Sequence, residues 1–79
     1  MELTEQQIEE LLEKAWLVLE ETGSLTQDDF VQRCKLDEVP EPIAVLERLG
    51  LVEKREDQLE FTPEGRRRAE LVIRHHRLA

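Results

Sequence analysis

The chain has 79 residues, of which 39% are hydrophobic and 38% charged, and its formal net charge is −8. This length predicts one domain over residues 1–79, with a core too small to divide. A lone cysteine excludes an internal disulfide and a cysteine-based zinc site. No apolar stretch approaches the roughly 18–20 residues that cross a bilayer, and the opening Met1-Glu2-Leu3 lacks the basic region and apolar run of a signal peptide, so we expect a cytoplasmic protein without a membrane segment.

The first predicted element is a helix that begins after Thr4. Thr4 and Gln7 have the spacing of a capping box, in which each side chain bonds the other residue's backbone N–H. Apolar residues then recur with helical period from Ile8 to Leu19. We expect this helix to run to about Glu21, with Gly23 as the left-handed residue that ends it.

The residues after that glycine predict a very short strand and a second helix. Ser24-Leu25 could pair with a later hairpin, and Thr26 begins a helix with Asp29 at its third position. The helix has barely two turns. We expect it to bury one edge, which consists of Phe30, Val31 and Cys34.

A third helix is predicted after a turn that contains two prolines. Residues that precede proline resist the helical conformation, so the turn falls within Lys35–Pro42. The helix should begin at Pro40 or Glu41 and end at Gly50. Its expected buried residues are Ile43, Leu46 and Leu49.

The last third of the chain predicts a β-hairpin followed by a helix. Leu51–Lys54 and Gln58–Phe61 alternate in part and flank a polar turn. Thr62 is suited to cap the helix, and Pro63 fits its first position, where no N–H is needed. One apolar stripe then comprises Gly65, Ala69, Val72, Ile73 and His76.

The run Phe61-Thr62-Pro63-Glu64-Gly65-Arg66, then Ala69, then His76-Arg77-Leu78, resembles a segment of the metal-dependent repressors of the diphtheria toxin repressor and manganese transport regulator family. In that family a "L-T-P-x-G-R-x-x-A" stretch leads to "H-R-L-x-E". The match extends in order over nearly the whole chain, and its final third is the specific part. The resemblance implies a mainly α, winged helix-turn-helix fold with three helices, a hairpin wing and an added C-terminal helix.

The resemblance also implies a metal site. His76 matches the ligand-bearing segment, and Glu10 and Glu13 match ligand positions on the first helix. Two carboxylates and an imidazole suit ferrous iron or manganese, Fe²⁺ or Mn²⁺. From the residues alone, a histidine in an apolar stripe is also the pattern of a buried structural residue. The family continues beyond this point, so we expect a longer protein that forms a homodimer through a region after Ala79.

Contacts with duplex DNA are implied for three elements. The third helix would carry Glu38 and Glu41 into the major groove. The wing, with Lys54 and Arg55, and the last helix, with Arg66 and Arg67, would meet phosphates. Acids outnumber bases by 9 to 1 over residues 1–29, whereas bases outnumber acids by 5 to 2 over residues 61–79. Carboxylates in front of the third helix repel phosphates, and the arginine run also fits a solvated face.

Two functional hypotheses therefore stand after the sequence alone. One is the DNA-binding domain of an iron- or manganese-dependent transcriptional regulator. The other is a repressor-like winged helix that has lost DNA binding and acts as a protein-interaction or metal-responsive accessory domain. No glycine-rich phosphate loop or nucleophile–base pair occurs, so we do not expect an enzyme.

Overall fold

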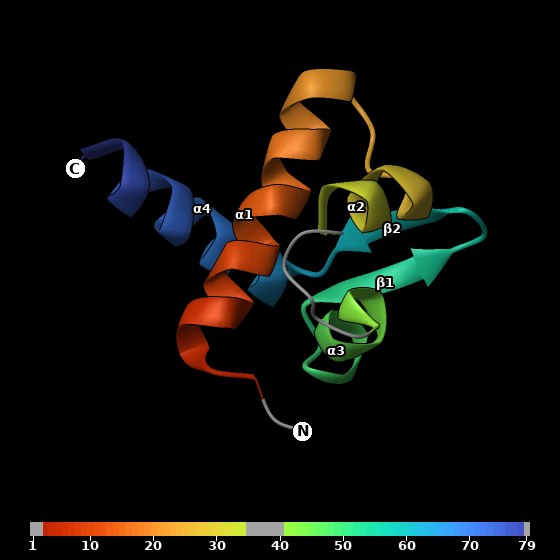
Figure 1. Ribbon diagram of the computed structural model, residues 1–79, viewed down its shortest axis with the longest axis horizontal. Helices are drawn as coiled ribbons and strands as arrows, with labels where there is room; N and C mark the ends of the chain where they lie inside the picture. Colours follow the sequence, from red (N-terminus) through yellow and green to blue (C-terminus); the bar gives the residue numbers. More distant parts are fainter. Residues whose placement is uncertain (1–2, 35–40, 79) are drawn as a thin grey trace.

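The computed structural model describes residues 3–34 and 41–78, with the side chains of the last helix described as far as His75. The described part is mainly helical and contains one small antiparallel sheet, as expected. Helix α1 runs through the middle of the molecule, with α4 on one side and α2, α3 and the hairpin on the other (Figure 1). The elements in chain order are α1 (Glu5–Thr22), α2 (Gln27–Cys34), α3 (Pro42–Arg48), β1 (Val52–Arg55), β2 (Gln58–Phe61) and α4 (Pro63–Leu78).

The caps of α1 are those that the sequence predicts. Thr4 Oγ1 accepts from the Gln7 N–H at 3.1 Å, and Gln7 Oε1 accepts from the Thr4 N–H at 2.9 Å. Gly23 ends the helix with φ 80°, and its N–H donates to the Leu19 carbonyl at 2.9 Å. The predicted end at Glu21 is one residue short. Both ends of α1 are therefore specified by local hydrogen bonds.

A short segment before α2 extends the sheet. The Leu25 carbonyl accepts from the Leu59 N–H at 2.8 Å, and the Asp57 carbonyl accepts from the Gln27 N–H at 2.9 Å. Between these bonds, Thr26 pairs with Gln58 as an isolated antiparallel bridge. The expected pairing of this segment with the hairpin is confirmed. It occurs one residue later than predicted.

Helix α3 begins at Pro42 rather than at Pro40 or Glu41. Pro42 disfavours the right-handed helical conformation for Glu41, which takes the left-handed conformation instead, with φ 51°. The segment 35–40, with the predicted turn and Glu38, lies outside the described residues. Gly50, with φ 75°, follows the helix and turns the chain toward β1.

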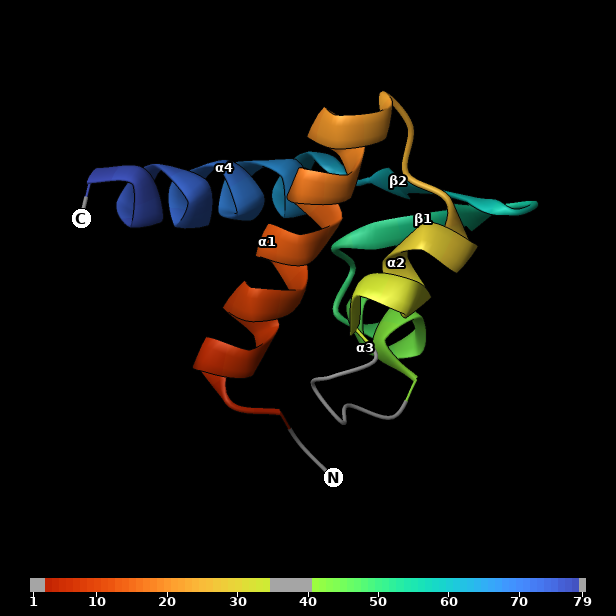
Figure 2. The same ribbon diagram turned by 45° about the horizontal axis from the view of Figure 1, so that its top comes forward.

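The hairpin has a tight turn at Glu56 and Asp57. Val52 pairs with Phe61 and Arg55 with Gln58, so the two strands match the predicted runs to within a residue. Glu56 has φ 56°, as a two-residue hairpin turn requires. Helices α2 and α3 lie together on one side of the hairpin, while α4 extends away from it (Figure 2).

One core joins these elements, and two predictions of burial are wrong. Phe30 and Cys34 are buried, but Val31 is 42% exposed because α2 presents only a narrow edge to the core. Leu46 is fully buried, whereas Leu49 is 46% exposed because it lies beyond the last turn of α3. The buried core cluster comprises Ile8, Leu11, Leu12, Ala15, Val18, Leu25, Phe30, Cys34, Leu46, Leu51, Val52, Leu59 and Ala69.

The junction between β2 and α4 is tightly fixed. Thr62 Oγ1 accepts from the Gly65 N–H at 3.0 Å and donates to the Gly50 carbonyl at 2.6 Å. Gly65 lies directly against the backbone of Leu51. An ion pair joins Arg68 to Glu5 across the α1–α4 contact. None of the described helices combines the length and apolar character needed to span a bilayer.

Candidate nucleic-acid interface and metal site

The two predicted bases of the hairpin face different surroundings. Arg55 Nε lies 2.6 Å from Glu60 Oε2, so this arginine is paired with the neighbouring strand. Lys54 is exposed beside Leu59 and has no acidic partner among the described residues. Because successive strand residues point to opposite faces of a sheet, the two cations cannot both contact the same flat surface.

The tip of the hairpin is held against the start of α2. The side-chain amide of Gln27 donates to the Glu56 carbonyl at 2.5 Å, in addition to the backbone bond from Gln27 to Asp57. The exposed side chains here are acidic, with Asp28 and Asp29 on α2 and Glu56 and Asp57 in the turn. No pattern in the sequence predicts this contact. The tip is therefore anchored and negative, unlike a free basic arm.

The first turns of α4 carry the remaining predicted phosphate contacts. Arg66 Nε lies 3.3 Å from Glu70 Oε1, whereas Arg67 is exposed and has no acidic partner among the described residues. Arg66 and Glu60 line the same shallow pocket, of about 210 Å³, over Leu59 and Phe61. Glu60 thus pairs with Arg55 and lines the same pocket as Arg66.

The ion pairs at this surface are weak. Arg66 and Glu70 side chains are 68% and 49% exposed, and Arg55 and Glu60 are 68% and 56% exposed. Such pairs contribute about 0–1 kcal/mol to stability, so a phosphate oxygen can replace a carboxylate at little cost. Their effect is to lower the net positive charge of the surface. They do not block the guanidinium groups.

The predicted groove-facing residues are only partly described. Glu41 is exposed and lies at the N-terminus of α3, as a base contact requires, while Glu38 lies outside the described residues. Arg48, in the last turn of α3, is exposed and was not predicted as a contact. Its position at the far end of the helix from Glu41 places it away from the end that usually meets base edges.

The predicted metal ligands belong to the two helices that cross. Glu10 is exposed and Glu13 half-buried on α1, and their spacing of three residues puts them on adjacent turns of one face. His76 lies in α4, but its side chain is outside the described set. Within the described residues, no three His, Cys, Asp or Glu side chains form a group that could hold a metal ion. The donor types fit iron or manganese, and the third ligand stays a prediction.

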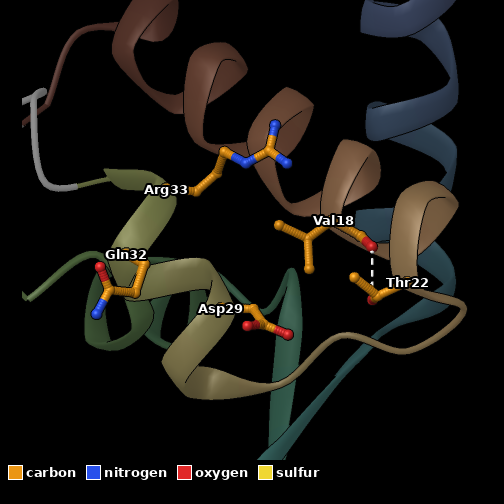
Figure 3. A pocket seen from close by; sticks show the side chains of 5 residues that line it. All are labelled: Val18, Thr22, Asp29, Gln32 and Arg33. Atoms are coloured by element: carbon orange, nitrogen blue, oxygen red, sulfur yellow. Dashed lines mark hydrogen bonds between the residues drawn. The ribbon is translucent and has the colours of Figure 1, made fainter.

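A groove of about 400 Å³ lies between α1 and α2, lined by Val18, Thr22, Asp29, Gln32 and Arg33. In Figure 3 the Arg33 side chain reaches toward α1, where it pairs with Glu21, and the Thr22 hydroxyl donates to the Val18 carbonyl. No buried side-chain polar atom in the described part lacks a hydrogen-bond partner. The groove therefore offers no uncompensated group that would indicate a ligand.

Comparison with known proteins gives no relative for this chain. No model of a protein family matches it, and neither a curated protein nor a solved structure does.

Proposed function

We propose that the chain is a winged helix-turn-helix domain that binds duplex DNA within an iron- or manganese-dependent transcriptional regulator. The observation that carries this proposal is the junction of β2 with α4. The Thr62 hydrogen bonds and the contact of Gly65 with Leu51 fix the basic first turns of α4 beside the hairpin. The order of three helices, a hairpin and a fourth helix supports the same fold class.

Phosphate binding in this proposal uses Arg55, Arg66 and Arg67. The first two exchange their exposed carboxylate partners for phosphate oxygens, and Arg67 has no described acidic partner to give up. Released counterions then supply much of the affinity. The start of α3 enters the major groove, where Glu41 can accept a hydrogen bond from the N4 amino group of cytosine.

The regulatory metal in this proposal is held by Glu10, Glu13 and His76. A bound divalent cation supplies fixed positive charge between α1 and α4, in a region where acids exceed bases. Glu10 and Glu13 present the hard oxygen ligands that manganese and ferrous iron accept. Because these ligands come from two crossing helices, metal binding would fix the α1–α4 angle and thereby the position of the basic turns.

A second candidate function is favoured by a specific observation. Arg33, Arg55, Arg66 and Arg68 are each paired with a carboxylate of the same chain, and the hairpin tip is acidic and anchored to α2. A surface on which carboxylates already neutralise the arginines suits a protein partner better than the phosphate backbone of DNA. The alternative is therefore a winged helix without DNA binding, which acts as a protein-interaction or metal-responsive accessory domain.

Fluorescence anisotropy with labelled duplex DNA over a range of salt concentrations separates the two functions. A DNA-binding domain should lose affinity steeply with salt, and Arg67→Ala should lower the slope of log K against log [salt] by about 0.9, the value for one phosphate contact. Arg33→Ala is the matched control, because Arg33 pairs with Glu21 of α1 and is not among the proposed phosphate contacts, and it should leave the slope unchanged. Absence of binding at low salt, with and without manganese, would support the accessory domain.

Metal binding is tested by calorimetric titration of the chain with Mn²⁺. His76→Ala should weaken binding, and His75→Ala is the matched control because His75 lies about 100° around the helix from its neighbour. Equal Mn²⁺ affinity of wild type and His76→Ala would refute the assignment of His76.

A further inference from the structure

One face of α4 carries an exposed leucine, Leu71, between two arginines, and this leucine also borders a groove of about 300 Å³ that Glu9 of α1, Val72 and His75 line. Leu71 is 53% exposed, the largest exposure among the large hydrophobic residues of the described part. Arg67 and Arg74 lie four residues before and three residues after it, so all three share one face. Neither arginine has an acidic partner among the described residues, although four other arginines do. This basic stripe has an apolar centre.

One face of α1, formed by Glu13, Leu17 and Glu20, has the same spacing with the opposite charge. Glu13 and Glu20 lie four residues before and three residues after Leu17, which is half-buried. At 1.5 Å per residue, the charged positions of each stripe are separated by about 10.5 Å along the helix. The acidic stripe of α1 and the basic stripe of α4 therefore match in length, in charge and in the position of a leucine.

The distribution of charge over the chain agrees with this match. Residues 1–29 hold 9 acids and 1 base, and residues 61–79 hold 5 bases and 2 acids. A phosphate backbone would pair with the arginines but would leave Leu71 without an apolar partner. One exposed leucine is also too little apolar area for a membrane surface. An acidic helix with a central leucine satisfies all three residues at once.

We propose that this partner is a second copy of the chain, in which the basic stripe of α4 (Arg67, Leu71, Arg74) packs on the acidic stripe of α1 (Glu13, Leu17, Glu20) of the other copy. Leu71 then lies against Leu17, and the arginines lie beside the glutamates. The contact uses Arg67 and Glu13, so while it forms it competes with the proposed phosphate and metal binding of these two residues. It is tested without DNA and with a chelator present, so its outcome can be distinguished from theirs.

The test is sedimentation velocity of the whole chain from about 10 µM to 1 mM, a range that covers weak association. We expect the wild type to associate with rising concentration and to dissociate at high salt. Two charge-reversed variants, Arg67→Glu/Arg74→Glu and Glu13→Arg/Glu20→Arg, should each associate at least about tenfold more weakly. An equimolar mixture should regain the association, because the reversed α4 of one variant then meets the reversed α1 of the other.

Arg48→Glu is the control, because it reverses an exposed charge on α3 and should not change association. Circular dichroism establishes that each variant is folded, and the recovery in the mixture excludes a general loss of structure. A wild type that stays monomeric throughout would overturn the proposal. So would association that survives both charge reversals, or a mixture that associates no better than its separate components.

Discussion

Replacement of Gly65 by alanine tests how closely α4 lies against the hairpin. A Cβ at this position would lie 1.8 Å from the carbonyl oxygen of Leu51 and 2.7 Å from its carbonyl carbon. Normal contacts between such atoms are about 3.3–4.0 Å. The Leu51 carbonyl cannot simply rotate away, because it accepts a hydrogen bond from the Thr62 N–H at 3.1 Å. The helix must therefore move off the junction.

The expected cost follows from these contacts. Overpacking of this kind costs about 1–3 kcal/mol, and weakening the Thr62–Leu51 hydrogen bond adds about 1 kcal/mol. An alanine in an unobstructed helix would instead stabilise by about 1 kcal/mol relative to glycine. A net loss of about 1–3 kcal/mol is large for a domain whose total stability is about 4–12 kcal/mol. The midpoint of thermal unfolding should fall by about 4–24 °C.

Thermal and urea unfolding followed by circular dichroism measure this loss. Gly23→Ala is the matched control, since Gly23 has φ 80° and no atom would lie within 4 Å of its new Cβ. That substitution should cost only about 1 kcal/mol, from the left-handed backbone. The reasoning is refuted if Gly65→Ala unfolds at the wild-type temperature or above it, or if its loss is no larger than that of Gly23→Ala.

Three further predictions concern caps, core and sheet. Thr62→Ala should lower the free energy of unfolding by about 1–2 kcal/mol, because it removes the helix cap and a hydrogen bond to a backbone carbonyl. Thr62→Ser should keep most of this stability, and urea titration measures both variants. Leu46→Ala should cost about 2–5 kcal/mol in the same assay. Leu49→Ala should cost under about 1 kcal/mol, although the sequence predicts that both leucines are core residues. Glu53→Lys should stabilise by about 0.2–1 kcal/mol, since Glu53 lies directly opposite Glu60; a lower melting temperature would contradict this.

The ends of the helices could be read from the sequence because their signals are local. Thr4, Gly23 and Thr62 each make a capping hydrogen bond to an atom within four residues along the chain. Burial in the short helices could not be read in this way. Val31 and Leu49 are apolar and suitably spaced, but whether such a residue is covered depends on a neighbouring element. Helices of seven or eight residues have too few turns for the spacing of their apolar residues to show which of them are buried.

The candidate site was less predictable than the fold. The type and position of Arg55 and Arg66 suggested phosphate contacts, but their pairing with Glu60 and Glu70 depends on side-chain placement. The hydrogen bond from Gln27 to the hairpin tip joins residues 29 positions apart, and no local sequence pattern predicts it. The DNA and metal roles stay predictions, and those of Glu38 and the His76 side chain fall outside the described residues.

The contact between α1 and α4 also affects the order in which the chain folds. Glu5 and Arg68 are 63 residues apart in sequence, and closing a loop of that length costs about 4 kcal/mol of chain entropy. The hairpin, by contrast, closes across a two-residue turn, and α2 lies close to it. Docking of α4 should therefore come late, after the hairpin and α2 have formed. Until that step, the apolar face of α1 is open to other chains, so slow docking would expose the protein to aggregation.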